Sequence, residues 1–340
     1  MDNSSSKVLN VDKDFGGDLD KAIAAANDGD TVELGRKTYK TDGIELNKDI
    51  TIDGVRGQTV MDGDSGHTFI DRGRTSNTIF TLHSDASGTT IKDAEITNGD
   101  NGVNVTGAKN VTLSNLDINN IGIENPVRND GTHNIGISLA DADGFKVLDS
   151  EISDIGRKGI GVIDTDGGII DGVTLSNINL AAEHSQSVDA AGIKLFNTNE
   201  ITISDNKLSG VNAFNIWDDI TSNTTIDGNE ITGVGDDFLA PEYNTFVRVG
   251  GIYVEKTHQT TVDSNKVTVG NDDFYAFDAT EFSTETMVLG DNNEFPSTDI
   301  GSTDFWANEE MEKKVAITED PDAADFSLFA DDFYNGGTYG

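Results

Sequence analysis

Short runs of alternating apolar and polar residues recur along most of the chain, with Gly, Asn or Asp between them. One copy consists of Gly-Ile-Lys-Leu-Phe at 192–196 followed by Ile-Thr-Ile-Ser at 201–204. Alternation with period two predicts β-strands with one buried face, and the Gly, Asn and Asp residues predict tight turns. Copies begin near residues 43, 79, 102, 136, 159, 192, 213, 251 and 276.

The short repeat predicts the architecture. Two copies begin only 21 residues apart, at 192 and 213, so a single copy cannot enclose a core of its own. Stacked copies can share one. We therefore predict an all-β protein, a right-handed parallel β-helix solenoid of about nine coils.

The two ends of the chain depart from the repeat. Leu19, Ile23 and Ala26 form an apolar stripe on a predicted helix over 18–27, which would cover the first open coil. Beyond residue 293 the repeat fades into an acidic tail with several aromatic residues, which we interpret as an irregular cap. The expected organisation is an N-terminal cap at 1–40, the β-helix at 41–295 and a C-terminal capping tail at 296–340.

The charge balance restricts the partners. The net charge of −38 would repel nucleic acid and acidic membranes. Cysteine is absent, so disulfides and thiol chemistry are excluded. No apolar run approaches the length of a membrane span, and the first residues are not a secretory signal. We expect a monomer that is secreted or held at the cell surface and does not insert into the membrane.

The N-terminal region carries a family resemblance. Asp-Phe-Gly at 14–16, Ala-Ile-Ala-Ala-Ala at 22–26, Gly-Asp-Thr-Val-Glu-Leu at 29–34 and Tyr39 resemble the opening of pectate-lyase-like β-helix proteins. That group includes polysaccharide lyases, glycoside hydrolases and secreted mannuronan C5-epimerases, and the composition is most similar to the epimerases. The resemblance covers about residues 8–295 and implies a carbohydrate-active β-helix protein. The epimerases' Tyr-Gly-Phe-Asp-Pro-His run is not retained, since the corresponding strand at 159–164 lacks His and Asp-Pro.

Outward positions of the repeat predict a site. In the Gly-Ile-x-Val-x strand the third and fifth residues face solvent, and successive coils lie about 4.8 Å apart, so each position forms a column. These columns gather polar and aromatic residues toward the C-terminal half. We predict a catalytic role for Lys194, Tyr253, His184 and Glu255, and substrate binding by Phe196, Asn215, Trp217, Arg248 and Tyr243. The alternative is that Phe196 and Trp217 merely lie under the C-terminal tail.

Three long returns, at 120–134, 181–191 and 235–250, leave the solenoid at the same corner. Loops of this kind build groove walls on a rigid scaffold, although they are also tolerated as decoration. They would add Arg128, His133, Glu183, His184, Glu242, Tyr243 and Arg248 to the groove.

Two acidic turns are predicted to stack. Asp141 and Asp143 precede Gly144, and Asp164 and Asp166 precede Gly167, at matching places on adjacent coils. Carboxylates so close repel one another unless a cation lies between them, and Asp-x-Asp-Gly turns offer the oxygen ligands that Ca²⁺ prefers. We predict Ca²⁺ here, against the alternative that Asp serves only the turn backbone.

A second column is predicted to be structural. Asn206, Asn229, Asn265 and Asn292 follow the later strand on successive coils, and stacked amides can hydrogen-bond along the axis.

Three functions remain open at this point. The first is a secreted, Ca²⁺-assisted enzyme that acts on an anionic, uronate-type polysaccharide by lyase or C5-epimerase chemistry. The second is a non-catalytic carbohydrate-binding, adhesin or structural module. The third is an inverting glycoside hydrolase, for which Glu255 and Asp218 would be a suitable carboxylate pair. We favour an enzyme.

Overall fold

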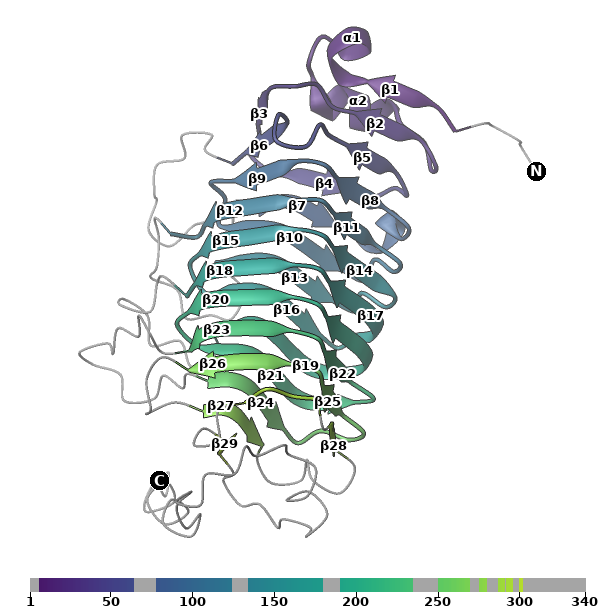
Figure 1. Cartoon of the computed structure of the whole chain (residues 1–340). Helices are drawn as coiled ribbons and strands as arrows, with labels where there is room; N and C mark the ends of the chain where they lie inside the picture. The colour runs from purple at the N-terminus through teal and green to yellow at the C-terminus, as the bar shows by residue number, and fades with distance from the viewer. Residues whose placement is uncertain are drawn as a thin grey trace, which may run out of the picture.

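The computed structural model describes residues 6–63, 78–123, 134–179, 190–234, 250–269, 275–279, 287–290, 292–295 and 300–301. These residues form a right-handed parallel β-helix, in which every strand pairs in parallel with the equivalent strand one coil away. Figure 1 shows the coils stacked from the N-terminal helices to the C-terminal strands. The predicted fold class is confirmed.

The strands form three parallel ladders that run along the stack. The first ladder contains β4 (Ile44–Leu46), β7 (Thr78–Leu82), β10 (Asn101–Thr106), β13 (Ile135–Ala140), β16 (Lys158–Ile163), β19 (Ala191–Ser204), β21 (Phe214–Ser222), β24 (Gly250–Glu255), β27 (Tyr275–Ala279) and β29 (Ile300–Gly301). The second contains β1 (Val8–Asn10), β2 (Thr31–Glu33), β5 (Thr51–Asp53), β8 (Thr90–Lys92), β11 (Thr112–Ser114), β14 (Phe145–Leu148), β17 (Asp166–Asp171), part of β19, β22 (Thr225–Asp227), β25 (Thr261–Asp263) and β28 (Val288–Leu289).

The third ladder has nine strands, which are β3 (Thr38–Lys40), β6 (Val60–Asp62), β9 (Glu95–Thr97), β12 (Asp117–Ile121), β15 (Glu151–Ile155), β18 (Thr174–Ile178), β20 (Lys207–Val211), β23 (Glu230–Val234) and β26 (Lys266–Val269). Strand β19 is long enough to pair in both the first and the second ladder, so it joins them into one sheet. The nine strands of the third ladder agree with the estimate of about nine coils.

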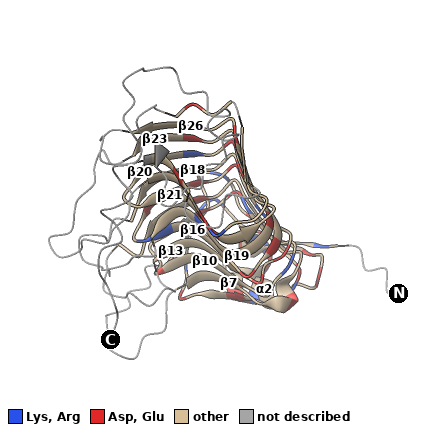
Figure 2. Ribbon diagram, turned by 90° about the horizontal axis from the view of Figure 1, so that it is seen from below, with Lys and Arg blue, Asp and Glu red and all other residues tan. Residues whose placement is uncertain are grey.

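The core lies inside the coils because alternate residues of each strand point inward. One interior column of the first ladder includes Leu46, Leu82, Val105, Leu139, Val162 and Leu195, each at most 2% exposed. The apolar positions of the repeat therefore build one continuous core. Charged residues occur on coils throughout the stack, as Figure 2 shows from below.

The N-terminal end is covered as predicted, but by two helices. Helix α1 spans Val11–Phe15 and α2 spans Leu19–Ala25, and the Asp18 side chain caps α2 by accepting a hydrogen bond from the Lys21 amide. The buried residues of this cap are Val11, Leu19, Ala22 and Ala26, whereas Ile23 is only partly buried. A further short 3₁₀ helix, η1, spans Ser84–Ala86. The predicted C-terminal cap lies outside the described residues, apart from β29.

The amide ladder exists, and its last member differs from the prediction. The side-chain amide of Asn206 donates to Asn229 Oδ1 at 2.9 Å, and that of Asn229 donates to Asn265 Oδ1 at 2.9 Å. Asn265 then donates to Asn293, not to Asn292, at 3.1 Å. Asn292 is exposed and donates to Asp263 instead. Sequence counting missed this because the final coil contains one more residue between the strand and the ladder.

Candidate functional site

One outward column of the first ladder contains Lys194, Trp217 and Tyr253 on three successive strands. Lys194 is the register partner of Trp217, and Trp217 is the register partner of Tyr253. The predicted separation of two coils between Lys194 and Tyr253 is confirmed. With a copy of the repeat beginning at residue 213, Trp217 was predicted in the fifth-residue column, but it lies between them.

The error in the column arose on β21. Phe214 pairs with Ala191 and Ile216 with Ile193, so Asn215 lies opposite Gly192, the first residue of the preceding copy of the repeat. The repeat therefore begins two residues later than the sequence pattern indicated. The cause is Asp218, which occupies the inward position that Leu195 and Val254 occupy on the flanking coils. A polar residue in a core position concealed the alignment.

Asn215 consequently does not face solvent. It is 1% exposed and donates from Nδ2 to the Gly250 carbonyl at 3.0 Å. Its predicted place on the outward face is wrong, and its side chain links β21 to the first residue of β24. Within the described part of the chain, the buried Oδ1 of Asn215 accepts no hydrogen bond.

Aromatic rings surround the centre of the column. Phe214 stacks on Tyr253 with ring centroids 4.2 Å apart and planes 4° from parallel. Trp217 meets both rings edge-on, with centroids 5.5 Å from Phe214 and 6.0 Å from Tyr253. The sequence did not indicate Phe214, because its contact with Tyr253 exists only after β21 and β24 pair.

The Lys194 ammonium lies above the Trp217 ring. Its Nζ is 3.4 Å from the Trp217 centroid and 5.8 Å from that of Phe196. Lys194 is 9% exposed and Tyr253 only 1% exposed, so the face is more enclosed than its outward position predicted. The Nε1 of Trp217 is also buried and donates no hydrogen bond to the described residues.

The next outward column contains Phe196, Asp219 and Glu255, again on three successive strands. Asp219 is 7% exposed, whereas Glu255 is half-buried and accepts from Lys256 Nζ at 2.7 Å. The outward acid beside Glu255 is thus Asp219. Asp218 is fully buried on the other side of the strand. The carboxylate pair suggested for an inverting hydrolase, Glu255 with Asp218, is therefore wrong.

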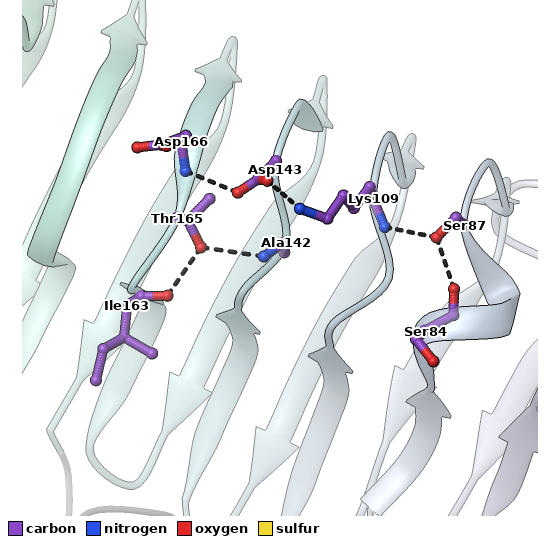
Figure 3. A network of polar contacts seen from close by, with 8 residues as sticks. All are labelled: Ser84, Ser87, Lys109, Ala142, Asp143, Ile163, Thr165 and Asp166. Carbon is purple, nitrogen blue, oxygen red and sulfur yellow. Dashed lines mark hydrogen bonds and ion pairs between the residues drawn. The ribbon is translucent and has the colours of Figure 1, made fainter.

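The acidic turns stack as expected, but Asp143 is neutralised by the chain itself. Lys109 pairs with one carboxylate oxygen of Asp143, and the Asp166 amide donates to the other at 2.9 Å. Figure 3 shows this contact continuing from Lys109 to Ser87 and Ser84. The hydrogen bond from Lys109 is the main reason that the pKa of Asp143 lies below its usual range.

The backbone conformation at Asp141 and Asp164 explains why Asp occupies these two positions. Asp141, Asp164, Asn197, Ile220 and Lys256 form one corner column, and all have φ between 49° and 54°. Asp and Asn are among the residues that tolerate this left-handed region best. No three or more acidic or histidine side chains within the described segments are grouped so that they hold a metal ion. The Ca²⁺ assignment stays a prediction, and the turn geometry does not require it.

Several predicted site residues lie outside the described residues. These are His184, Tyr243 and Arg248, together with the loop residues Arg128, His133, Glu183 and Glu242. Their predicted roles remain predictions.

Comparisons with known proteins agree on the fold. A family model described as the right handed beta helix region matches residues 135–299. An alginate lyase from Paenibacillus sp. has a similar structure, with a TM-score of 0.58, 16% identity and coverage of 85% of this chain and 95% of that one. A surface adhesin of Streptococcus pneumoniae gives a TM-score of 0.55 at 12% identity, covering 88% and 91% of the two chains.

A bacteriophage CBA120 tailspike protein, described as an enzymatically active domain, gives a TM-score of 0.55 at 11% identity, and the match covers 91% of this chain and 44% of that one. No curated protein matches the sequence. None of the described helices is long and apolar enough to cross a membrane. At these identities the similar structures show the fold and not the activity.

Proposed function

We propose that this protein acts on an anionic, uronate-type polysaccharide at the outer face of β19, β21 and β24, by lyase or C5-epimerase chemistry. The observation that carries the proposal is the single outward column in which Trp217 lies between Lys194 and Tyr253. It places a cation and a phenol on either side of an aromatic ring. In this proposal the cation neutralises the uronate carboxylate, the aromatic ring stacks on the sugar and the phenol transfers a proton.

The chemistry follows from the uronate carboxylate. A lysine ammonium beside the carboxylate stabilises the negative charge that develops when the C5 proton leaves. Tyr253, as the phenolate, would accept that proton as general base, because the Lys194 ammonium has no electron pair to accept it. In a lyase, the C4–O4 bond then breaks, the C4–C5 double bond forms and O4 takes a proton. In an epimerase, C5 takes a proton from the opposite face and no bond of the polymer breaks.

The surroundings of the column support carbohydrate binding. Phe196 and Trp217 are partly exposed and present apolar ring surface beside Lys194. Trp217 Nε1 and Asn215 Oδ1 are a donor and an acceptor without partners among the described residues. The similar backbone of an alginate lyase is consistent with this substrate class.

We also place the protein outside the cell, secreted or at the surface, as a monomer. Its net charge of −38 would repel an acidic polymer unless cations lie between them. Lys194, the other basic residues and Ca²⁺ from the medium would supply that charge. Ca²⁺ is thus an assisting ion in the proposal, tested by a chelator.

A non-catalytic surface module is the second candidate. The observation that favours it is the near-complete burial of Tyr253 and its stack on Phe214, which suit a packed aromatic cluster better than a mobile proton donor. Such a module would bind the polymer without changing it.

One experiment separates the candidates. The purified protein is incubated with polymannuronate, alginate and pectate, with and without EDTA. Unsaturated ends are followed by absorbance, epimerisation by proton NMR and binding by affinity electrophoresis. Cleavage or epimerisation supports the enzyme, and binding without either supports the surface module. Absence of binding to all three polymers contradicts both.

A further inference from the structure

A carboxylic acid lies inside the β-helix directly beneath the candidate site. Asp218 occupies the interior column of the first ladder, between Leu195 on β19 and Val254 on β24. Its exposure is 0%, and the other members of this column are apolar. Burial of an acid in such a position is costly unless hydrogen bonds compensate. The hydrogen-bond partners of Asp218 therefore indicate its role.

Threonine hydroxyls from two coils meet this carboxyl group. Thr221 Oγ1 donates to Asp218 Oδ1 at 2.7 Å, and Thr260 Oγ1 donates to Oδ2 at 3.1 Å. Thr224 Oγ1 lies 3.2 Å from Thr221 Oγ1 and extends the cluster. Thr224 and Thr260 immediately precede β22 and β25 of the second ladder. Asp218 thus ties the middle of β21 to the corner where the second ladder begins.

The preceding coil provides an internal comparison. Thr198 is the register partner of Thr221, but Leu195 occupies the position equivalent to Asp218. The Oγ1 of Thr198 is buried and makes no hydrogen bond with the described residues. The threonine column therefore exists without the acid, and Asp218 adds a connection that the preceding coil lacks.

The segment between Asp218 and Thr221 contains a residue with a strained backbone. Between Asp218 and Thr221 the chain passes through Ile220, whose φ is 54°. A β-branched residue rarely adopts this left-handed conformation, which is retained only where surrounding contacts enforce it. The residues on either side of Asp218 are Trp217 and Asp219, which belong to the two outward columns of the candidate site.

We propose that Asp218 is a positioning residue, whose buried carboxyl group holds the corner at Ile220 within β21 and so sets the place of Trp217 on the outer face. Proton uptake in the core is then sensed at that face. The importance of Trp217 to a ligand rests on the proposed function. The coupling between protonation of Asp218 and the position of Trp217 does not.

The electrostatic surroundings support coupling near neutral pH. Burial raises the pKa of Asp218 to about 6, while hydrogen bonds from Thr221, Thr260 and Thr224 act in the opposite direction. Its register partners on the neighbouring strands are uncharged, Leu195 on β19 and Val254 on β24. Asp219 on its own strand adds a small repulsion that also raises the pKa. Lys194 and Glu255 lie in outward columns, on the opposite side of the sheet.

Tryptophan fluorescence tests the coupling without any ligand. The chain has two tryptophans, Trp217 and Trp306, so Trp306→Phe leaves Trp217 as the only emitter. Its emission is titrated from about pH 4.5 to pH 8, a range that brackets the shifted pKa. We expect a transition with a midpoint near pH 6, where the Asp218 carboxyl group titrates. Asp218→Asn should remove this transition, whereas Asp227→Asn, which removes an exposed acid of the same coil, should retain it.

A second variant covers the case in which Asp218→Asn does not fold. Thr260→Val removes a hydrogen bond that lowers the pKa, so the midpoint should move to higher pH. An identical transition in Asp218→Asn, or an unchanged midpoint in folded Thr260→Val, would overturn the inference. Binding of a uronate oligosaccharide is measured separately at the two ends of the titration. Absence of binding with the fluorescence transition intact would contradict the proposed function alone.

Discussion

The ammonium of Lys194 lies 3.4 Å from the centroid of the Trp217 ring, and the two residues are register partners on β19 and β21. A cation over an indole ring contributes about 0.5–2 kcal/mol, the larger value where water is excluded. With Lys194 only 9% exposed, the ring limits the positions that its charge can take. The parallel pairing of two coils thus creates a fixed cation beside partly exposed aromatic surface.

Lys194→Ala and Tyr253→Phe test the proposed chemistry. If the protein is a lyase or an epimerase, each should lower turnover by about 10²-fold or more, the scale for a lost general acid or base. Trp217→Ala should chiefly raise KM. Lys207→Ala is the control, because Lys207 is an exposed lysine on the third ladder. Full activity in both Lys194→Ala and Tyr253→Phe would show that the column is not the active site.

The buried carboxyl group of Asp218 predicts an unusual pH dependence of stability. Its pKa in the folded chain is about 6, above the value of 3.8 for an exposed group. The folded state therefore binds the proton more tightly, so this contribution is fully present below pH 3.8 and is lost as pH rises through 6. Two pKa units correspond to about 3 kcal/mol.

Urea denaturation of wild type and Asp218→Asn measures this contribution. The free energy of unfolding of the variant, relative to wild type, should rise by up to about 3 kcal/mol between acid and mildly alkaline pH. A constant difference across that range would mean that the Asp218 carboxyl group is not shifted.

Asn229→Leu should destabilise the fold without affecting the outer face. Asn229 is 1% exposed and both donates to and accepts from a neighbouring ladder amide. Removing its side chain takes away the oxygen that accepts from both the backbone and the side-chain amide of Asn206, at a cost of about 1–3 kcal/mol. Asn292→Leu, at an exposed position outside the ladder, should change the free energy of unfolding much less. Equal effects of the two changes would contradict the interior role of Asn229.

Stabilisation of the acidic turns by Ca²⁺ can be compared with neutralisation of Asp143 by Lys109. In wild type we predict that Ca²⁺ raises the melting temperature, by an amount that follows its concentration relative to the dissociation constant. Lys109→Gln removes the cation that pairs with Asp143 and leaves Asp141, Asp143 and Asp166 closer to self-repulsion. The variant should therefore gain more from Ca²⁺ than wild type. Melting temperatures unaffected by EDTA in both proteins would exclude Ca²⁺ from these turns.

Much of the fold was predictable because its signals are local. The alternation of apolar residues, the Gly, Asn and Asp turns and the short period together required stacked coils with a shared interior. The Asn ladder followed from the same counting, since identical positions of adjacent coils lie in register. Its last member was missed because the final coil does not keep the repeat length. Lys194 and Tyr253 were predicted two coils apart because equivalent positions of adjacent coils lie in register, and the structure agrees.

The site depended on information that the repeat does not contain. Asp218 at a core position hid the true register of β21, so Trp217 was predicted in the neighbouring outward column and Asn215 was predicted on the outer face, where it does not lie. The stacking of Phe214 on Tyr253 and the enclosure of Lys194 arise from packing between coils, which no single copy of the repeat encodes. Likewise, the charge on Asp143 is balanced by Lys109, which is 34 residues away along the chain. The sequence by itself determined the solenoid, through the period of its apolar residues. Which side chains meet was decided only by the tertiary structure, because parallel pairing brings together residues from different coils.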